Sequence, residues 1–163
     1  MTAETFTLHP ITSQDREWMR TLLTDHWGSV EIVSRGRIYL ADRLPGFIAW
    51  KAGSRVGLIT YDIEDSQCEI ITIDSLVPEI GIGSALIDRV NQEARTQNCQ
   101  RIWLITTNDN LPALRFYQKR GFRLVAVYPN AIAVSRKLKP SIPFIGIDGV
   151  PIRDEIELEV QLK

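Results

Sequence analysis

The chain of 163 residues is 44% hydrophobic, which suits one domain with a sizeable core. Its 19 Lys and Arg residues almost balance its 20 Asp and Glu residues, so the net charge of -1 provides no general attraction to nucleic acid or to an anionic membrane. Residues 1–10 lack the pattern of a secretory signal, and no apolar run approaches the length of a membrane span. We therefore expect a cytoplasmic protein with neither nucleic acid nor a membrane as a partner.

The two cysteines indicate neither a disulfide framework nor a zinc site. Cys68 and Cys99 form no CxxC motif, and both lie in apolar or mixed segments without neighbouring His residues. Thiols of a cytoplasmic protein stay reduced. We expect two free thiols and no bound metal.

The first half of the chain shows mainly strand patterns after one helix. Apolar spacing and turn residues predict, in chain order, a strand at 5–9, a helix over 15–24, strands at 38–40 and 47–50, a turn at 51–54, a strand at 55–63 and a strand at 68–76. The strands on either side of the turn are expected to form a hairpin. The last strand is apolar on both faces, which predicts a central position in a sheet.

Helices and strands alternate in the second half. The pattern predicts a helix over 84–97 stopped by Asn98, a strand at 101–106, a helix over 112–120 ended by Gly121, a strand at 122–128, a short helix near 131–138 and a final strand at 156–162. Segment 129–154, rich in Pro and Gly, is long for a loop, which is typical of functional or mobile segments. The order indicates an α/β or α+β fold with a mixed sheet.

A glycine-rich turn joins the strand at 68–76 to the following helix. Gly81 and Gly83 allow close approach of a ligand, and the first amides of the helix have no acceptor within the helix, so the turn could hold an anion. A nucleotide-hydrolase loop is excluded because Ser84, not Lys, follows Gly83. A dinucleotide fingerprint fits poorly because Leu86 stands where a small residue is needed. A tight turn without a ligand is the remaining alternative.

A second motif follows the strand at 101–106. Residues 110–122 have the form Asn-x-x-Ala-x-x-Phe-Tyr-x-x-x-Gly-Phe. With the glycine turn, in this order and spacing, the segment resembles the GNAT superfamily of N-acetyltransferases. The resemblance spans about 46–128 and is strongest over 68–122. It implies that residues 1–163 form one domain, in which a mixed sheet splayed in its middle binds acetyl-CoA as co-substrate.

The resemblance also implies roles for individual residues. It places the pyrophosphate of acetyl-CoA on the backbone amides of Ile80, Gly81, Ile82, Gly83, Ser84 and Ala85, and the pantetheine arm beside Asn110 and the strand end from Ile73 to Leu76. Tyr117 becomes the general acid that protonates the leaving thiolate, since a phenol with a pKa near 10 is protonated at neutral pH. Packing for Tyr117 and helix capping for Asn110 are the alternatives.

A direct transfer also needs a group that takes a proton from the amine. Glu69, on the strand that leads into the glycine turn, is the first candidate, and Asp74 is the reserve; an ordinary surface charge is the alternative for Glu69. In related enzymes the N-terminal region that here holds His26 and Glu31 shapes the acceptor site. Further residues that could contribute to the acceptor site are Trp27, Tyr39, Trp50, Glu155, Glu157 and Glu159. For the three glutamates a solvated strand face is the expected arrangement.

These observations predict an N-acetyltransferase that moves an acetyl group from acetyl-CoA directly to a primary amine. A protein that binds acyl-CoA as a sensor without turnover is the alternative. The acceptor stays open among small amines, amino acids, aminoglycosides and peptide N-termini. The apolar segment 142–152 could cover the cleft or a second subunit, so a homodimer is one expected assembly.

Overall fold

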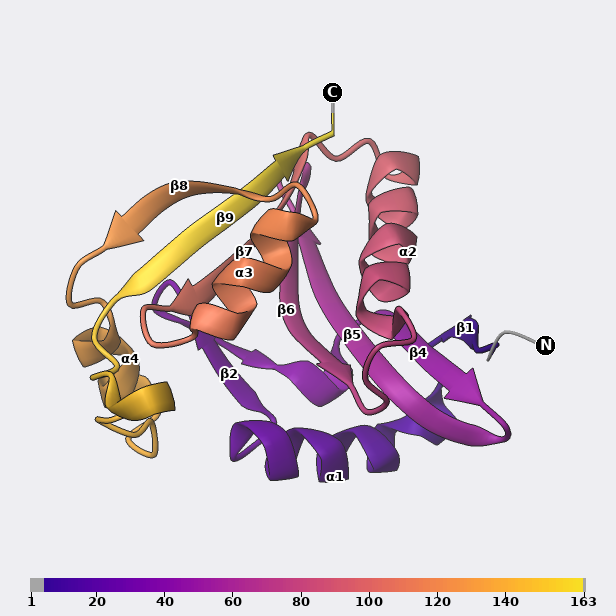
Figure 1. Cartoon of the computed structure of the whole chain (residues 1–163), viewed down its shortest axis with the longest axis horizontal. Coiled ribbons are helices and arrows are strands. Elements are labelled where there is room, and N and C mark those ends of the chain that lie inside the picture. Colours follow the sequence, from indigo (N-terminus) through magenta and orange to yellow (C-terminus); the bar gives the residue numbers. More distant parts are fainter. Residues whose placement is uncertain (1–4, 163) are drawn as a thin grey trace.

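The computed structural model describes residues 5–162, in which seven strands form one mixed sheet (Figure 1). In spatial order these strands are β1 (Thr7–Pro10), β4 (Gly46–Lys51), β5 (Ser54–Glu64), β6 (Gln67–Ser75), β7 (Arg101–Thr107), β9 (Glu155–Gln161) and β8 (Arg123–Tyr128). A separate hairpin consists of β2 (Glu31–Ser34) and β3 (Arg37–Leu40). The sheet confirms the mixed α/β architecture expected from the sequence.

Four α-helices accompany the sheet (Figure 1). They are α1 (Arg16–Trp27), α2 (Ile82–Thr96), α3 (Leu111–Lys119) and α4 (Ile132–Leu138), with 3₁₀ turns at 13–15, 41–43 and 147–149. The predicted left-handed stop after α2 is present, because Asn98 has a φ of 59°. None of the helices within residues 5–162 combines the length and apolar character needed to span a membrane.

The two largest helices cover opposite faces of the sheet. On one face α1 packs Met19 and Leu23 against strand residues that include Ile48 and Leu58. On the other face α2 packs against the residues that alternate with these, such as Ile59. Because successive side chains of a strand point to opposite faces, β4 and β5 contribute to both cores at once. This explains why both strands are apolar along most of their length.

The sheet splits between β6 and β7, its only parallel pair among the described strands. These two strands pair at three positions, from Gln67 with Arg101 to Glu69 with Trp103. Beyond that point β6 continues to pair with β5, and β7 with β9, while the facing edges of β6 and β7 separate. A bulge at Ile71 increases the local bend of β6. The predicted splayed sheet is therefore confirmed, with Glu69 at the point of separation.

Several element boundaries differ from the sequence-based predictions. Strand β2 was not predicted, because only two apolar residues, Ile32 and Val33, interrupt a polar segment and leave no readable period. Helix α2 begins at Ile82, two residues early, because Gly81 with a φ of 85° serves as its N-cap. Strand β9 lies between β7 and β8, so β8 forms the edge of the sheet.

Candidate functional site

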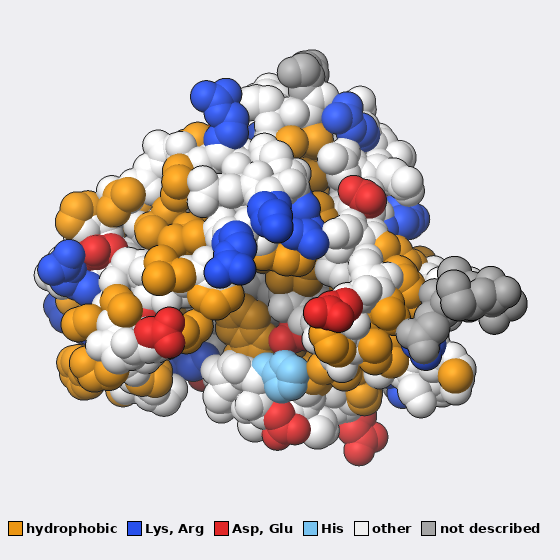
Figure 2. Space-filling view, viewed as in Figure 1, with side chains coloured by type: hydrophobic (Ala, Val, Ile, Leu, Met, Phe, Trp, Pro, Cys, Tyr) orange, Lys and Arg blue, Asp and Glu red, His pale blue; other side chains and the backbone are white. Residues whose placement is uncertain are grey.

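Two adjacent hollows share Tyr117 in their lining. The first, of about 410 Å³, borders the glycine turn, and the second, of about 360 Å³, lies deeper, where β6 and β7 separate. Ile73, Ala113 and Tyr117 line both. The space-filling view shows the surface hollowed between α3 and α1, with Lys and Arg side chains above the hollow and a His side chain below it (Figure 2). A ligand could therefore extend from the turn into the interior.

The first turn of α2 offers a set of unpaired backbone donors. Gly81 provides no side-chain cap, and no other group within residues 5–162 accepts from the amides of Ile82, Gly83 or Ser84. Gly81, Ile82, Gly83 and Ser84 all line the outer hollow. Free amides at a helix N-terminus attract anions, so this arrangement suits a phosphate group.

Gly83 is required for packing as well as for access. A Cβ atom at this position would lie 2.9 Å from Cζ of Phe116, which belongs to α3. We expect Gly83→Ala to lower the free energy of unfolding by about 1–3 kcal/mol, because it overpacks the contact between α2 and α3. Thermal denaturation measures this loss. The second change Phe116→Leu should recover part of it, whereas additive losses in the double variant would contradict the proposed contact.

Arg120 places a fixed positive charge beside the glycine turn. Its Nε donates to Oγ of Ser84 over 2.8 Å, one Nη donates to the carbonyl oxygen of Phe116 over 2.8 Å, and its guanidinium lies 3.5 Å from the centroid of the Phe116 ring. Sequence analysis missed this residue because it occupies a variable position of the second motif. Glu79, with a φ of 66°, lines the same hollow, so a carboxylate faces the same space.

Tyr117 is buried in the wall that both hollows share. Its ring makes edge contacts with Phe116 and Phe122, at centroid distances of 5.2 and 5.4 Å. Burial raises the pKa of the phenol, and the nearby charge of Asp74 adds to the effect. The phenol is therefore a proton donor at every pH in the ordinary working range. Among the described residues the Tyr117 hydroxyl has no hydrogen-bond partner, and it does not belong to the fully buried polar atoms, so it is available to a ligand in the hollows that Tyr117 lines.

Asn110 caps α3 and lines the deeper cavity. Its Oδ1 accepts a hydrogen bond from the amide of Ala113 at 3.2 Å, which confirms the capping alternative. This cap bond uses the side-chain oxygen of Asn110. The side-chain amide nitrogen is therefore the group that can donate a hydrogen bond to a ligand. The two predicted roles of Asn110 are thus compatible.

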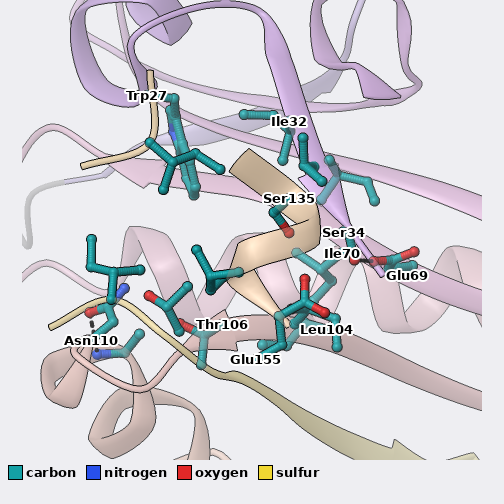
Figure 3. A pocket seen from close by; sticks show the side chains of 18 of the residues that line it. Trp27, Ile32, Ser34, Glu69, Ile70, Leu104, Thr106, Asn110, Ser135 and Glu155 are labelled. Atoms are coloured by element: carbon teal, nitrogen blue, oxygen red, sulfur yellow. Dashed lines mark hydrogen bonds between the residues drawn. The ribbon is translucent and has the colours of Figure 1, made fainter. Parts of the chain in front are cut away.

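Glu69 is buried at the other end of the deeper cavity from Asn110 (Figure 3). The side chain accepts hydrogen bonds from Oγ of Ser34 at 2.6 Å and from the hydroxyl of Tyr39 at 2.9 Å. Only 5% of Glu69 is exposed, and this burial raises the pKa of its carboxyl group. The alternative of an ordinary surface charge is therefore wrong. Both donors come from the β2–β3 hairpin, and sequence analysis predicted neither bond.

The prediction that the glutamates of β9 lie on a solvated face is wrong for Glu155 and Glu157. These two residues are only 2% and 8% exposed. Glu155 accepts from the backbone amide and from Nη of Arg35, at 3.2 and 2.9 Å. Glu157 is bonded by Arg101 and by the Tyr128 hydroxyl, each at 2.8 Å. Arg35 belongs to the β2–β3 hairpin, whereas Arg101 and Tyr128 belong to β7 and β8, so both glutamates are paired within the fold rather than solvated.

The remaining acceptor-site candidates divide into two groups. Trp27 lines the deeper cavity, and its Nε1 donates to Asp74 at 3.1 Å, while Nδ1 of His26 lies 2.9 Å from the same carboxylate. Asp74 is thus already paired and does not line the cavity. Trp50 lies elsewhere, beside a hollow that borders Arg55 and the first strand.

Three of the predicted coenzyme-binding residues line neither hollow. The amide of Leu76 donates to the carbonyl of Val56 at 2.8 Å, and the amide of Ala85 donates to Gly81 at 3.0 Å. Ile80 packs against the core on the α2 face. The amides of Leu76 and Ala85 are thus engaged within the fold, whereas no group among residues 5–162 accepts from the amides of Ile80 and Gly81, which precede the free donors at 82–84.

Comparisons with known proteins agree with this geometry. The sequence model of the acetyltransferase (GNAT) family matches residues 13–122. The uncharacterized protein YdhI of Bacillus subtilis is 46% identical over 147 residues, which cover 87% of this chain and 92% of that protein.

Solved structures show the same fold at low identity. The IAA acetyltransferase of Bacillus cereus superimposes with a TM-score of 0.73 at 20% identity, covering 96% of this chain and 99% of that one. A GNAT family acetyltransferase from Elizabethkingia anophelis with acetyl-CoA bound has a TM-score of 0.69 at 22% identity, covering 96% and 97%. The family match, the relative and the splayed sheet lead to one conclusion: the chain belongs to the GNAT acetyltransferase family.

Proposed function

We propose that the protein is an N-acetyltransferase that moves an acetyl group from acetyl-CoA directly to a primary amine. The observation that carries this proposal is the arrangement of two adjacent hollows, with free helix amides in one, the carboxylate of Glu69 in the other and Tyr117 in the lining of both. An anion site, an acid and a base in adjacent hollows meet the needs of acyl transfer from a phosphorylated carrier.

The chain's own residues fit acetyl-CoA. The amides of Ile82, Gly83 and Ser84, together with Arg120, would hold the pyrophosphate. The unpaired edges of β6 and β7 would take the pantetheine arm, with Asn110 as a side-chain donor. Bound acetyl-CoA in the Elizabethkingia anophelis neighbour supports this choice of ligand. The coenzyme supplies an acetyl group activated as a thioester.

Two side chains would move protons in the reaction. Glu69 is a carboxylate whose raised pKa makes it a better proton acceptor than an exposed glutamate. Tyr117 holds its proton firmly until a stronger base, such as a departing thiolate, forms beside it. Many of the side chains that line the deeper cavity are aliphatic, which lowers the polarity around both groups and strengthens the electrostatic interactions between them and a bound substrate.

A direct assay tests the proposed function. The purified chain is incubated with acetyl-CoA and a panel of primary amines, free thiol is followed with time, and acetylated products are identified by mass. We expect thiol release that depends on an amine and yields its amide. Binding of acetyl-CoA without transfer to any amine would instead favour the acyl-CoA sensor.

Arg120 offers a separate test of the coenzyme site. We expect Arg120→Ala to raise the Kd for acetyl-CoA about tenfold, because a charge-assisted contact to phosphate is lost. Isothermal titration measures this change. The matched control is Arg115→Ala, an exposed residue of the same helix that lines neither hollow. Equal affinities of the two variants would exclude Arg120 from the phosphate site.

A further inference from the structure

The end of the deeper cavity away from the glycine turn has aliphatic walls. Six Ile and Val side chains from four parts of the chain form them: Ile32, Val33, Ile71, Ile132, Ile142 and Ile152. Trp27 and Ile32 lie on one side of the cavity, and Leu104 and Thr106 lie on the other (Figure 3). A molecule held here would contact mainly hydrocarbon.

Lys139 closes this end by joining two distant segments. Its Nζ donates to the carbonyl oxygens of Trp27 and Glu31, at 3.0 and 2.7 Å. These bonds tie the end of α4 to the segment between α1 and β2. Arg35 makes a second tie, since it pairs with Glu155 at 2.9 Å and lies 3.4 Å above the centroid of the Tyr128 ring. The hairpin and segment 129–154 thus form one roof.

The roof is itself held by internal hydrogen bonds. One Nη of Arg136 donates to the carbonyl oxygens of Pro143 and Ile152, at 2.8 and 2.7 Å. The buried carboxylate of Asp109 accepts from the amide of Ile147 at 3.0 Å, which attaches the loop to the end of β7. Segment 129–154 is therefore a structured cover, held together by its own hydrogen bonds and attached to the end of β7.

Two buried carboxylates differ in their charge balance. Glu155 is paired with Arg35, whereas Glu69 accepts two hydroxyl hydrogen bonds and forms no salt bridge with any of the described residues. The nearby charges of Arg37 and Asp62 shift the pKa of Glu69 in opposite directions. A buried carboxylate without a salt-bridge partner is stabilised further when a positive ligand balances it or when it takes up a proton. Glu69 is thus suited to receive an ammonium group.

We propose that the acceptor is a small primary amine with a compact apolar body, whose ammonium group binds Glu69 while its hydrocarbon part packs under the roof. The inference rests on the proposed function and narrows its substrate class. The deeper cavity, of about 360 Å³, lies near the lower end of small-molecule sites, and it would also receive the end of the pantetheine arm, so the space left under the roof suits a small amine better than a peptide.

The proposed transfer balances in protons and bonds. The ammonium gives one proton to Glu69, and the nitrogen lone pair forms the amide C–N bond as the thioester C–S bond breaks. Tyr117 donates its proton to the departing sulfur, and the second proton of the amine restores the phenol. Glu69 returns its proton to solvent, so one proton is released for each amide formed.

A selectivity measurement tests the proposal. We compare kcat/KM for 2-phenylethylamine and hexylamine with that for a tetra-alanine peptide that has a free N-terminus. We expect the apolar amines to exceed the peptide at least a hundredfold. Without coenzyme, the amines should also raise the thermal midpoint of the chain, and Glu69→Gln should abolish this shift. A peptide acetylated as efficiently as the amines would overturn the inference and leave the proposed function intact.

Lys139 provides the matched variants. Lys139→Ala removes the two hydrogen bonds that join α4 to the segment between α1 and β2, so the ratio of amine to peptide kcat/KM should fall at least tenfold. Lys137→Ala, an exposed residue in the last turn of the same helix, should keep the wild-type ratio. An unchanged ratio in Lys139→Ala would contradict the role of the roof. Coenzyme binding without acetylation of either class would overturn the proposed function as well.

Discussion

Tyr117→Phe should lower kcat about 10²–10⁴-fold while leaving the KM for acetyl-CoA nearly unchanged. The substitution removes only the hydroxyl, and the ring keeps its edge contacts with Phe116 and Phe122. Because burial raises the pKa of the phenol, the wild-type group stays protonated and can donate to a leaving thiolate. Steady-state kinetics with thiol detection measures the change.

Tyr61→Phe is the matched control for this variant. Tyr61 is also buried, and burial raises its pKa to about 12, yet it stacks on Phe47 in the core away from the two hollows that form the candidate site. We expect it to retain full activity. If Tyr117→Phe lost no more activity than Tyr61→Phe, Tyr117 would be a packing residue, and water would be the source of the proton.

Glu69→Gln should lower kcat by a similar factor and remove the acidic limb of the pH profile. In the wild type the carboxyl group must lose its proton before it can accept one from the ammonium. Its pKa is raised by burial above the ordinary value of 4.5, so kcat/KM should rise with pH above that value. Gln cannot titrate, so the variant should lack this dependence. Glu64→Gln, at an exposed position, is the control.

The same variant should gain stability at neutral pH. A carboxyl group whose pKa is raised in the folded state binds its proton more tightly there than in the unfolded chain, so its contribution is lost as pH rises through the folded-state pKa. Gln is neutral and avoids the cost of burying a charge. At pH 8 we expect a higher Tm for Glu69→Gln than for wild type, with a rise of about 2–4 °C for each 1 kcal/mol gained in the free energy of unfolding. Near pH 4 the two Tm values should converge.

A Tm difference that stayed constant from pH 4 to pH 8 would contradict the titration of Glu69 and indicate altered packing instead. Ser34 and Tyr39 remain as partners for the Gln side chain, since each hydroxyl can also accept. A variant that loses activity and gains stability is typical of a functional residue whose charge is costly to bury in the folded protein.

Sequence patterns predicted the two segments that border the outer hollow, the glycine turn and the start of α3. The glycine turn and residues 110–122 each belong to one continuous segment of strand, turn and helix. The spacing of residues along such a segment is enough to predict its local structure. The splayed sheet and the order of most elements followed from the same resemblance, and the structure confirms both. Which of the turn residues have free amides did not follow, because Leu76 and Ala85 bond to groups that motif spacing does not identify.

The acceptor side depends on contacts between residues far apart in the chain. Ser34 and Tyr39 reach Glu69 across 35 and 30 positions, and Arg35 reaches Glu155 across 120. Such pairs produce no regular pattern of residues in the sequence. A hydrogen bond fixes the distance between two side chains in space, but it does not fix their separation along the chain. Family membership and the glycine turn at the start of α2 could thus be predicted from local order, whereas the burial of Glu69 and the shape of the deeper cavity depend on how the hairpin and segment 129–154 pack on the sheet.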